Sequence, residues 1–353
     1  MKIGISTGGG DCPGINAVIR SVVQASIVTH GWRVLGIEDS FAGLIWPQRT
    51  RELGLDDVRD LLSRGGTILG TTNRDNPLKY PLATNGVTEV CDLSSRCVRN
   101  ARELGLDALV VVGGDGTMAI ALELFRKGIP LVGVPKTIDN DLAGTEVTFG
   151  FDTALHTAAD AMDKIHCSAE SHHRVMLVEL MGRSAGWIAL EAGMAAGADV
   201  ILIPEIPFKL ENVCDAVLRR DRAGRNFTII AVAEGILLPS NLRAQPSSGQ
   251  SMTRTELLRE AIANLTGKET RLTVLGHIQR GGAPSPFDRI LCTRFGVAAV
   301  DLIAAGKFGR MVSLRQGRVD SVPLQEAVNG ARLVDPEGEL VHAARAIGIC
   351  FGD

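Results

Sequence analysis

Residues 110–117 have the sequence Val-Val-Val-Gly-Gly-Asp-Gly-Thr, in which three valines give way abruptly to glycines and a carboxylate. Such an apolar run is typical of a buried parallel strand that delivers a loop at its carboxyl end. Residues 129–141 repeat the arrangement, because an apolar run as far as Val134 precedes three polar side chains. Ligands of open α/β sheets bind where the carboxyl ends of neighbouring strands meet. The two stretches therefore predict a site for phosphates or a metal ion at one edge of a sheet.

Alternating strand and helix patterns extend outward from this stretch along most of the chain. Strands are expected at residues 2–6, 31–39, 108–112, 129–134, 174–180, 200–203, 228–233 and 272–275, and a hairpin at 311–323. Helices are expected at residues 15–23, 56–63, 98–104, 118–127, 152–167, 186–196, 211–222, 253–265 and 287–305, and an exposed loop at 239–250. This order predicts the α/β class with doubly wound, mainly parallel sheets. A new alternating set beyond residue 150 favours a second domain.

Composition sets the broad class of the protein. A length of 353 residues corresponds to two domains, or one large one, at roughly 150 residues per domain. The net charge of -3 and the lack of a basic run give no support for a nucleic-acid partner. Seven scattered cysteines without a C-x-x-C pair indicate free thiols in a reducing compartment. Without a signal peptide or a long apolar run, we expect a cytoplasmic protein with no membrane partner.

Carboxylates at the predicted sheet edge suit phosphoryl transfer, which requires a metal holder, positive groups and a base. Asp115 between glycines suits Mg²⁺, which favours one or two carboxylates together with phosphate oxygens. Asp139 and Asp141 lie two residues apart, so that one can act as a base beside the other. Ordinary turn chemistry would also explain these aspartates. The glycine-rich residues 7–14 are likewise open to two interpretations, a phosphate cradle or a bare strand-to-helix turn.

Four arginines stand at the ends of predicted strands in the second half of the chain, namely Arg174, Arg183, Arg271 and Arg280. A sugar phosphate favours the planar, bidentate fork of arginine. Solvated arginines at strand ends are the alternative. His277 lacks the partner spacing of a metal ligand and is expected to donate a hydrogen bond to a phosphate or to pack.

Taken together, the motifs resemble those of the 6-phosphofructokinase family. The matching blocks are residues 9–14, 113–117, 135–141, 181–183, 203–205 and 276–280. The Gly-Gly-Asp-Gly-Thr motif also occurs in NAD kinases and diacylglycerol kinases, which lack the third and sixth of these blocks. The resemblance implies two Rossmann-like α/β domains with the active site in the cleft between them. It assigns residues 1–150 and about 279–325 to donor binding, and residues 151–278 and about 326–353 to sugar-phosphate binding.

The same resemblance implies a role for each matching residue. Asp139 would be the base for the 1-hydroxyl of fructose 6-phosphate, supported by Thr137 and Asp141. Asp115 would hold Mg²⁺. The donor would meet Gly10, Arg74, Gly114, Asp115, Gly116, Thr117 and Lys136. The sugar phosphate would meet Thr137, Asp139, Met181, Gly182, Arg183, Glu234, His277 and Arg280. Arg183 would also meet the transferring phosphoryl group.

Relatives in this family also lend arginines to a neighbouring subunit. Arg174 and Arg271 match those arginines, which implies a homo-oligomer, commonly a tetramer. One departure concerns the arginine near the transferring phosphoryl, because Asn73 takes its aligned place and Arg74 follows one residue later.

Two residues give opposite indications about the phosphoryl donor. Gly116 leaves room for a nucleotide, where pyrophosphate-using relatives carry an aspartate, and so favours ATP. Lys136 is typical of pyrophosphate users. We expect ATP, with pyrophosphate as the alternative, because a lysine can swing aside whereas a carboxylate against a phosphate is costly to neutralise. A non-catalytic sugar-phosphate-binding homologue is a further alternative, and sedoheptulose 7-phosphate remains open as a second acceptor.

Overall fold

The computed structural model describes residues 1–84, 87–243 and 252–353, and the chain divides into two compact units. The first unit comprises Met1–Ile138, Leu142–Thr153 and Arg280–Ala331. The second comprises Asp139–Asp141, Ala154–Gln279 and Arg332–Asp353. Each unit is therefore assembled from three separate segments of the chain.

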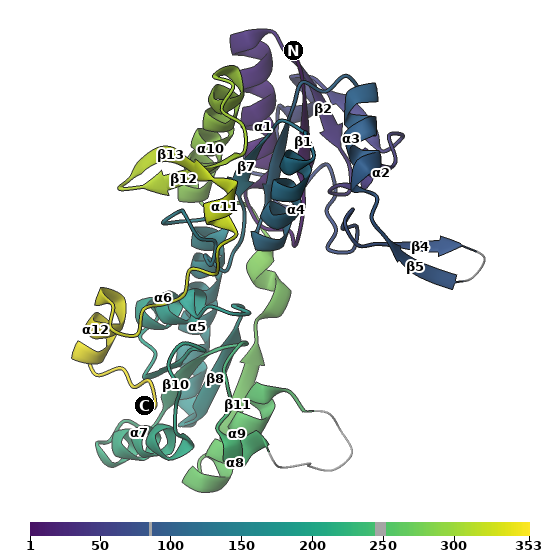
Figure 1. Ribbon diagram of the computed structural model, residues 1–353. Coiled ribbons are helices and arrows are strands. Elements are labelled where there is room, and N and C mark those ends of the chain that lie inside the picture. Colours follow the sequence, from purple (N-terminus) through teal and green to yellow (C-terminus); the bar gives the residue numbers. More distant parts are fainter. Residues whose placement is uncertain (85–86, 244–251) are drawn as a thin grey trace. The chain divides into compact units, whose positions relative to one another are not determined.

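A seven-stranded sheet forms the centre of the first unit, with the strand order β13-β12-β7-β6-β1-β2-β3 (Figure 1). The strands are β1 (Lys2–Thr7), β2 (Arg33–Ile37), β3 (Thr50–Leu53), β6 (Ala108–Gly113), β7 (Leu131–Pro135), β12 (Arg310–Arg315) and β13 (Arg318–Pro323). The five inner strands are parallel, and the two edge strands are antiparallel. Every residue of β6 and β7 is buried, as expected for a parallel sheet that is covered on both faces.

Helices cover this sheet. They are α1 (Ile15–Gln24), continued by the π-helix Ala25–Thr29, α2 (Ala42–Ile45), α3 (Ser94–Glu103), α4 (Asp115–Arg126), α10 (Pro286–Ala304) and α11 (Leu324–Ala327). Figure 1 shows α1 and α10 side by side. Their close approach depends on Gly296, because a Cβ there would lie 1.9 Å from Oγ of Ser21. The first segment of the unit is thereby packed against its last.

The second unit contains a four-stranded, all-parallel sheet with the order β11-β8-β10-β9. Its strands are β8 (Val175–Leu180), β9 (Val200–Leu202), β10 (Thr228–Ala233) and β11 (Thr270–Val274). Its helices include α5 (Phe151–His172), whose first residues belong to the first unit, α6 (Trp187–Ala195), α7 (Leu210–Arg222), α8 (Ser240–Arg243), α9 (Arg254–Thr266) and α12 (Glu339–Ala346). The expected α/β class with mainly parallel sheets is confirmed. Within the described parts of the chain, none of the helices is both long and apolar enough to span a bilayer.

Several local expectations are wrong. Residues 56–63 do not form a helix, since only Asp56–Val58 make a 3-10 turn. The stretch buries only Val58 and Leu61, and one short turn with so little apolar anchoring does not sustain a helix. The predicted strand at 31–39 is cut short because Gly31 and Asp39 have left-handed φ angles of 64° and 53°.

Other elements were missed. They include β3, α12 and the hairpin of β4 (Tyr80–Thr84) with β5 (Val87–Cys91), which extends away from the seven-stranded sheet (Figure 1). Of the expected loop at 239–250, Ser240–Arg243 instead form α8, and residues 244–250 lie outside the described residues.

Candidate active site

The Gly-Gly-Asp-Gly-Thr stretch forms the junction between β6 and α4. Gly113 is required for the turn, because a Cβ there would lie 2.3 Å from Cβ of Thr117. Asp115 is exposed in the first turn of α4, where the helix dipole favours negative charge. Gly116 is also exposed, and a Cβ placed there would meet no other atom within 4 Å. The amino end of α4 is therefore open for an anionic ligand.

The glycine loop after β1 lies beside this junction. The amide of Gly8 donates to the carbonyl of Val112 at 2.9 Å, which joins the ends of β1 and β6. Nζ of Lys136, at the end of β7, donates to the carbonyl of Gly10 at 2.5 Å, and the lysine is only 4% exposed. A Cβ on Gly10 would lie 2.4 Å from Nη1 of Arg280. Two cationic side chains thus contact one glycine loop.

Arg280 has unused hydrogen-bonding capacity at this loop. Its Nε is buried and has no hydrogen-bond partner among the residues that the structure describes. A buried donor without a partner is costly, and a bound anion would satisfy it. Arg280, expected to bind the sugar phosphate, thus lies against the predicted donor residue Gly10, and it ends the same 3-10 turn, Gly276–Arg280, that carries His277.

Residues 64–74 form a loop that is fastened to the glycine loop rather than solvated along its length. The side chain of Asn16, which is 1% exposed, donates to the carbonyls of Arg64 and Gly65 and accepts from the amide of Ile68. Further along, Oγ1 of Thr71 donates to the carbonyl of Gly9 at 2.6 Å. These bonds fix the approach of the loop to the predicted donor site.

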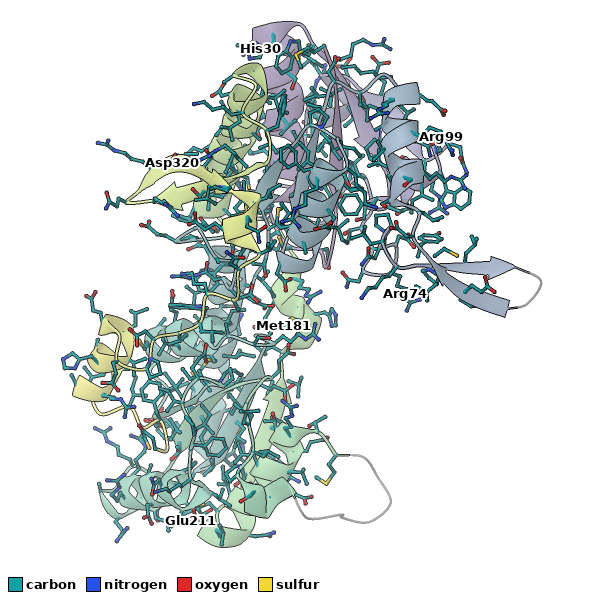
Figure 2. The ribbon with its side chains drawn as sticks, in the orientation of Figure 1. His30, Arg74, Arg99, Met181, Glu211 and Asp320 are labelled. Carbon is teal, nitrogen blue, oxygen red and sulfur yellow. The ribbon has the colours of Figure 1, made fainter. Side chains whose placement is uncertain are left out.

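Asn73 and Arg74 at the end of this loop are both exposed. Figure 2 labels Arg74 near the base of the β4–β5 hairpin. Oδ1 of Asn73 lies 3.8 Å from the position that a Cβ on Gly9 would take. Asn73 is therefore within reach of the glycine loop, in keeping with its aligned place in the motif.

The polar loop after β7 carries Thr137, Asp139 and Asp141. Asn140 between the two aspartates is 2% exposed and has a left-handed φ of 52°, a conformation that asparagine tolerates better than most residues. The carbonyl of Thr137 accepts from Oγ1 of Thr148 at 2.7 Å. Asp139 and Asp141 are half-buried, so their carboxylates combine an anchored backbone with access to a ligand.

In the second unit, three neighbouring strands end at one edge of the sheet. Met181, Gly182 and Arg183 follow β8, Glu234 follows β10, and His277 lies in the 3-10 turn after β11. A Cβ on Gly235 would lie 2.3 Å from the carbonyl oxygen of Arg183, so the first two of these turns are in contact. Met181, labelled in Figure 2, is buried and donates its amide to Oε1 of the fully buried Gln279 at 3.3 Å.

Arg183 and His277 at this edge are exposed, whereas Glu234 is half-buried. Parallel strands that end together place polar groups around one potential ligand site. The structure therefore brings these predicted sugar-phosphate residues together.

Arg174 and Arg271 lie elsewhere in the second unit. They stand at the amino ends of β8 and β11, and both pair with Glu269, at 2.9 and 2.6 Å. The hydrogen bond from Arg174 lowers the pKa of Glu269, with the charge of Arg271 contributing. The structure does not bring these two arginines together with Met181, Glu234 and His277 at the opposite ends of the strands.

No contacts with these loops were predicted for Asn16, Gln279 and Arg332, although Gln279 lies within the matching block at residues 276–280. Asn16 and Gln279 are buried polar side chains whose partners are distant in the chain. Arg332 bonds to Asn140, 192 positions away in the chain, so no local sequence pattern could indicate the contact. Among the described residues, no group of three or more His, Cys, Asp or Glu side chains is arranged to hold a metal ion.

The profile of the Phosphofructokinase family matches residues 2–303. The chain belongs to this family. It is 51% identical over 361 residues to a protein of Chloroflexus aurantiacus named ATP-dependent 6-phosphofructokinase, covering 100% of this chain and 98% of that protein. A pyrophosphate–fructose 6-phosphate 1-phosphotransferase of Amycolatopsis methanolica is 48% identical, with 96% and 97% covered.

A solved structure supports the same family assignment. The phosphofructokinase of Saccharomyces cerevisiae superposes with a TM-score of 0.77 at 32% identity. The match covers 93% of this chain but only 45% of the yeast chain, so this chain spans about half the length of that relative.

Proposed function

We propose that this protein is a 6-phosphofructokinase that transfers the terminal phosphoryl group of ATP to the 1-hydroxyl of fructose 6-phosphate. The observation that carries the proposal is the open space at Gly116 beside a glycine loop contacted by Lys136 and Arg280. This arrangement offers positive charge to the phosphates and room for the rest of a nucleotide. The relative that is 51% identical is named for the same donor.

The donor half of the site is proposed in the first unit. Gly10, Gly114 and Thr117 would bring backbone and hydroxyl donors to the phosphates, and the amino end of α4 adds its dipole. Lys136 and Arg280 would neutralise the charge that develops as the phosphoryl group leaves. Arg74, with Asn73 beside it, is also proposed to bind the donor.

Mg²⁺ is the proposed cofactor, and the residues present fit it. Asp115 is a single exposed carboxylate at an open helix end. Mg²⁺ requires only one or two protein carboxylates when substrate phosphates and waters complete its shell. When bound with the donor, the ion supplies positive charge to the phosphate oxygens.

The acceptor chemistry is proposed at the loop after β7. Asp139 would take the proton of the 1-hydroxyl, and Thr137 and Asp141 would hold the hydroxyl and the base in line with the phosphoryl group. The sugar phosphate would be bound by Met181, Gly182, Arg183, Glu234 and His277 in the second unit, and Arg183 would also meet the transferring phosphoryl group. Arg280, which the resemblance assigns to the 6-phosphate, is proposed for the donor instead. Arg174 and Arg271 pair with Glu269 at the other ends of their strands, which supports a role at a neighbouring subunit in a homo-oligomer, commonly a tetramer.

The choice of donor is tested by steady-state assays of the purified protein with ATP and with pyrophosphate, each with Mg²⁺ and fructose 6-phosphate. Turnover with ATP is the expected result. Turnover with pyrophosphate and none with ATP would establish the second candidate, which Lys136 and the Amycolatopsis methanolica relative favour. Sedoheptulose 7-phosphate can be compared as acceptor in the same assay.

A non-catalytic homologue is the remaining alternative, and Asp139 separates it from an enzyme. We expect Asp139→Asn to lower kcat by about 100-fold or more, as the loss of a general base does, while the protein still binds fructose 6-phosphate in calorimetry. Unchanged turnover in the variant would remove the base role. All seven cysteines are free in the structure, which supports a reducing, cytoplasmic location.

A further inference from the structure

Arg332 contacts the loop that carries the proposed base. Its amide donates to the carbonyl of Asp141 at 2.7 Å, and its Nη1 donates to the carbonyl of Asn140 at 3.0 Å. One residue thus binds two successive carbonyls of the loop. All of these residues belong to the second unit.

Trp187 fixes the side chain of Arg332 in turn. The guanidinium carbon lies 4.1 Å from the centroid of the Trp187 ring, and the indole N–H donates to the carbonyl of Arg332 at 2.9 Å. A guanidinium stacked on an aromatic face is held in plane with its donors in a fixed direction. The backbone and the side chain of Arg332 are therefore both oriented by one indole.

The chain just beyond Arg332 is anchored to the same region. Oε1 of Glu205 accepts from the amide of Val334 at 3.0 Å and from the amide of Gly186 at 2.9 Å. Gly186 immediately precedes α6, the helix that begins with Trp187. The segment from Arg332 to Val334 is thus attached at two points to the start of one buried helix.

We infer that Arg332, seated on Trp187, is a positioning residue that holds the Asp139–Asp141 loop in its catalytic geometry. The inference rests on the proposed role of Asp139 as base. Asn140 has a left-handed backbone, so the direction of its carbonyl is coupled to the directions in which its two neighbours project their carboxylates. Hydrogen bonds to the carbonyls of Asn140 and Asp141 therefore fix the direction of these carbonyls and, with it, the direction of the neighbouring carboxylates. Because a displacement of about 1 Å can cost about 100-fold in rate, these bonds matter more for turnover than for substrate binding.

The test is a split between kcat and KM. Arg332→Met keeps an unbranched side chain over Trp187 but donates no hydrogen bond to Asn140. We expect kcat to fall by about 30- to 100-fold, with KM for fructose 6-phosphate and the donor within about threefold. Arg332→Lys, which keeps one donor but not the planar fork, is expected to recover part of that loss. A kcat within about twofold of wild type in both variants overturns the inference.

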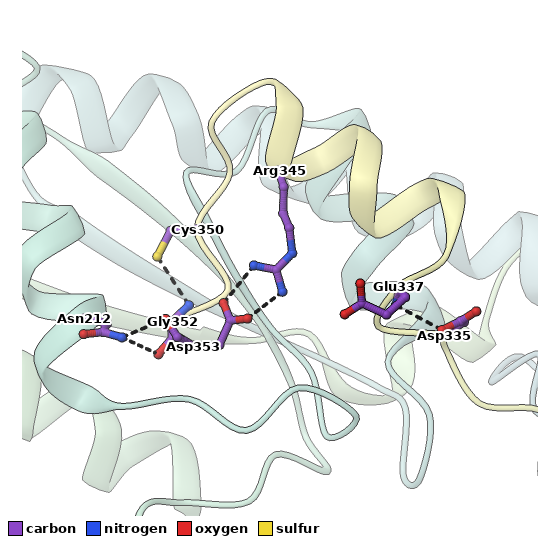
Figure 3. A network of polar contacts seen from close by, with 7 residues as sticks. All are labelled: Asn212, Asp335, Glu337, Arg345, Cys350, Gly352 and Asp353. Atoms are coloured by element: carbon purple, nitrogen blue, oxygen red, sulfur yellow. Dashed lines mark hydrogen bonds and ion pairs between the residues drawn. The ribbon is translucent and has the colours of Figure 1, made fainter.

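Arg345 provides a matched control in the same C-terminal segment (Figure 3). It lies over the ring of Phe351 at 5.0 Å and pairs with both carboxylate oxygens of Asp353, at 2.9 and 2.6 Å. Arg345→Met therefore also removes an aromatic-stacked, hydrogen-bonded arginine. We expect its kcat to stay within about twofold of wild type. An equal loss in Arg345→Met and Arg332→Met would indicate a general effect on the second unit and would overturn the positioning role.

A double variant separates failure of this inference from failure of the proposed function. If Arg332 acts through Asp139, adding Arg332→Met to Asp139→Asn lowers kcat no further, because residues that act as a unit are not additive. A full further loss in the double variant overturns the inference and leaves the base role intact. Unchanged turnover in Asp139→Asn alone would show that Asp139 is not the base, and the inference about Arg332 would then fail as well.

Discussion

The absence of a side chain at Gly116 bears on which phosphoryl donor the proposed site accepts. Packing does not require glycine at this position, because a Cβ there would meet no atom within 4 Å. The backbone does not require it either, because φ is not among the left-handed values. The fold would accept a larger residue, whereas the nucleotide proposed along the amino end of α4 would be opposed by a long or negatively charged one. Selection by the ligand rather than by folding is the simplest explanation of this glycine.

We therefore expect Gly116→Asp to separate activity from stability. A carboxylate beside the proposed phosphates would lower kcat/KM for ATP by about 100-fold or more, through repulsion between like charges at close range. The folded state should gain up to about 1 kcal/mol, because Asp is favourable in the first turn of a helix. Steady-state kinetics and thermal unfolding measure the two effects.

Gly116→Ala is the control for this substitution. It adds only a methyl group to open space, and is expected to gain about 0.5–1 kcal/mol from helix propensity while keeping most of the ATP activity. If the alanine variant loses as much activity as the aspartate variant, the loss in the aspartate variant does not come from its charge. The absence of any side chain at residue 116 would then be what activity requires.

At the scale of elements, the loop at residues 64–74 depends on a backbone contact. A Cβ on Gly65 would lie 2.2 Å from the carbonyl oxygen of Gly282, so alanine cannot enter without moving a main chain. We expect Gly65→Ala to cost about 1–3 kcal/mol, as overpacking does, and to raise KM for ATP because the loop is bonded to Gly9.

Gly66→Ala is the neighbouring comparison. Gly66 has a left-handed φ of 69° but open space around its Cβ position, so its substitution costs only about 1 kcal/mol of backbone strain. Denaturant midpoints of the two variants should therefore differ, with Gly65→Ala the less stable. The reverse order would show that strain, not the contact with Gly282, limits this loop.

The start of α5 is capped by a buried carboxylate from α10. Asp288 is fully buried and accepts from the amides of Gly150 and Thr153 and from Oγ1 of Thr153. Burial raises the pKa of Asp288 from 3.8 to about 6, although these hydrogen bonds oppose the shift. The cap joins a helix from late in the chain to one from its middle.

This shift predicts a pH dependence of stability. Between pH 4 and 6 the folded protein holds the Asp288 proton more tightly than the unfolded chain, so this group makes the protein less stable as the pH rises. Relative to Asp288→Asn, which does not titrate, the wild-type free energy of unfolding should fall by up to about 3 kcal/mol from pH 4 to 7. Urea midpoints of both proteins at pH 4, 5, 6 and 7 measure the difference. A difference that is constant with pH would contradict the raised pKa.

At the scale of the whole molecule, the sequence predicted the features that depend on neighbouring residues. Valine runs that end in glycine specified β6 and β7, because burial on both faces imposes that pattern. The β4–β5 hairpin was missed although residues 85–86 are Asn-Gly, a dipeptide typical of two-residue hairpins. The contacts of Arg280 with Gly10 and of Arg332 with Asn140 could not be predicted, because each joins residues that are distant in the chain and depends on tertiary packing alone.

The most distinctive property of the whole chain is that neither unit is continuous in sequence. The first unit needs residues 280–331 as well as 1–153, since α10 packs on α1 and β12 pairs with β7. We therefore expect a fragment of residues 1–153 to remain unfolded. Residues 1–153 joined to 280–331 through a flexible linker should fold, because the amide of Ser285 bonds Oγ1 of Thr153 at 2.9 Å and the two segments therefore lie close together. Near-ultraviolet circular dichroism and urea unfolding compare the two. Cooperative unfolding of the short fragment would show that α10 and β12 are dispensable, and an unfolded joined protein would show that the first unit depends on more than these segments.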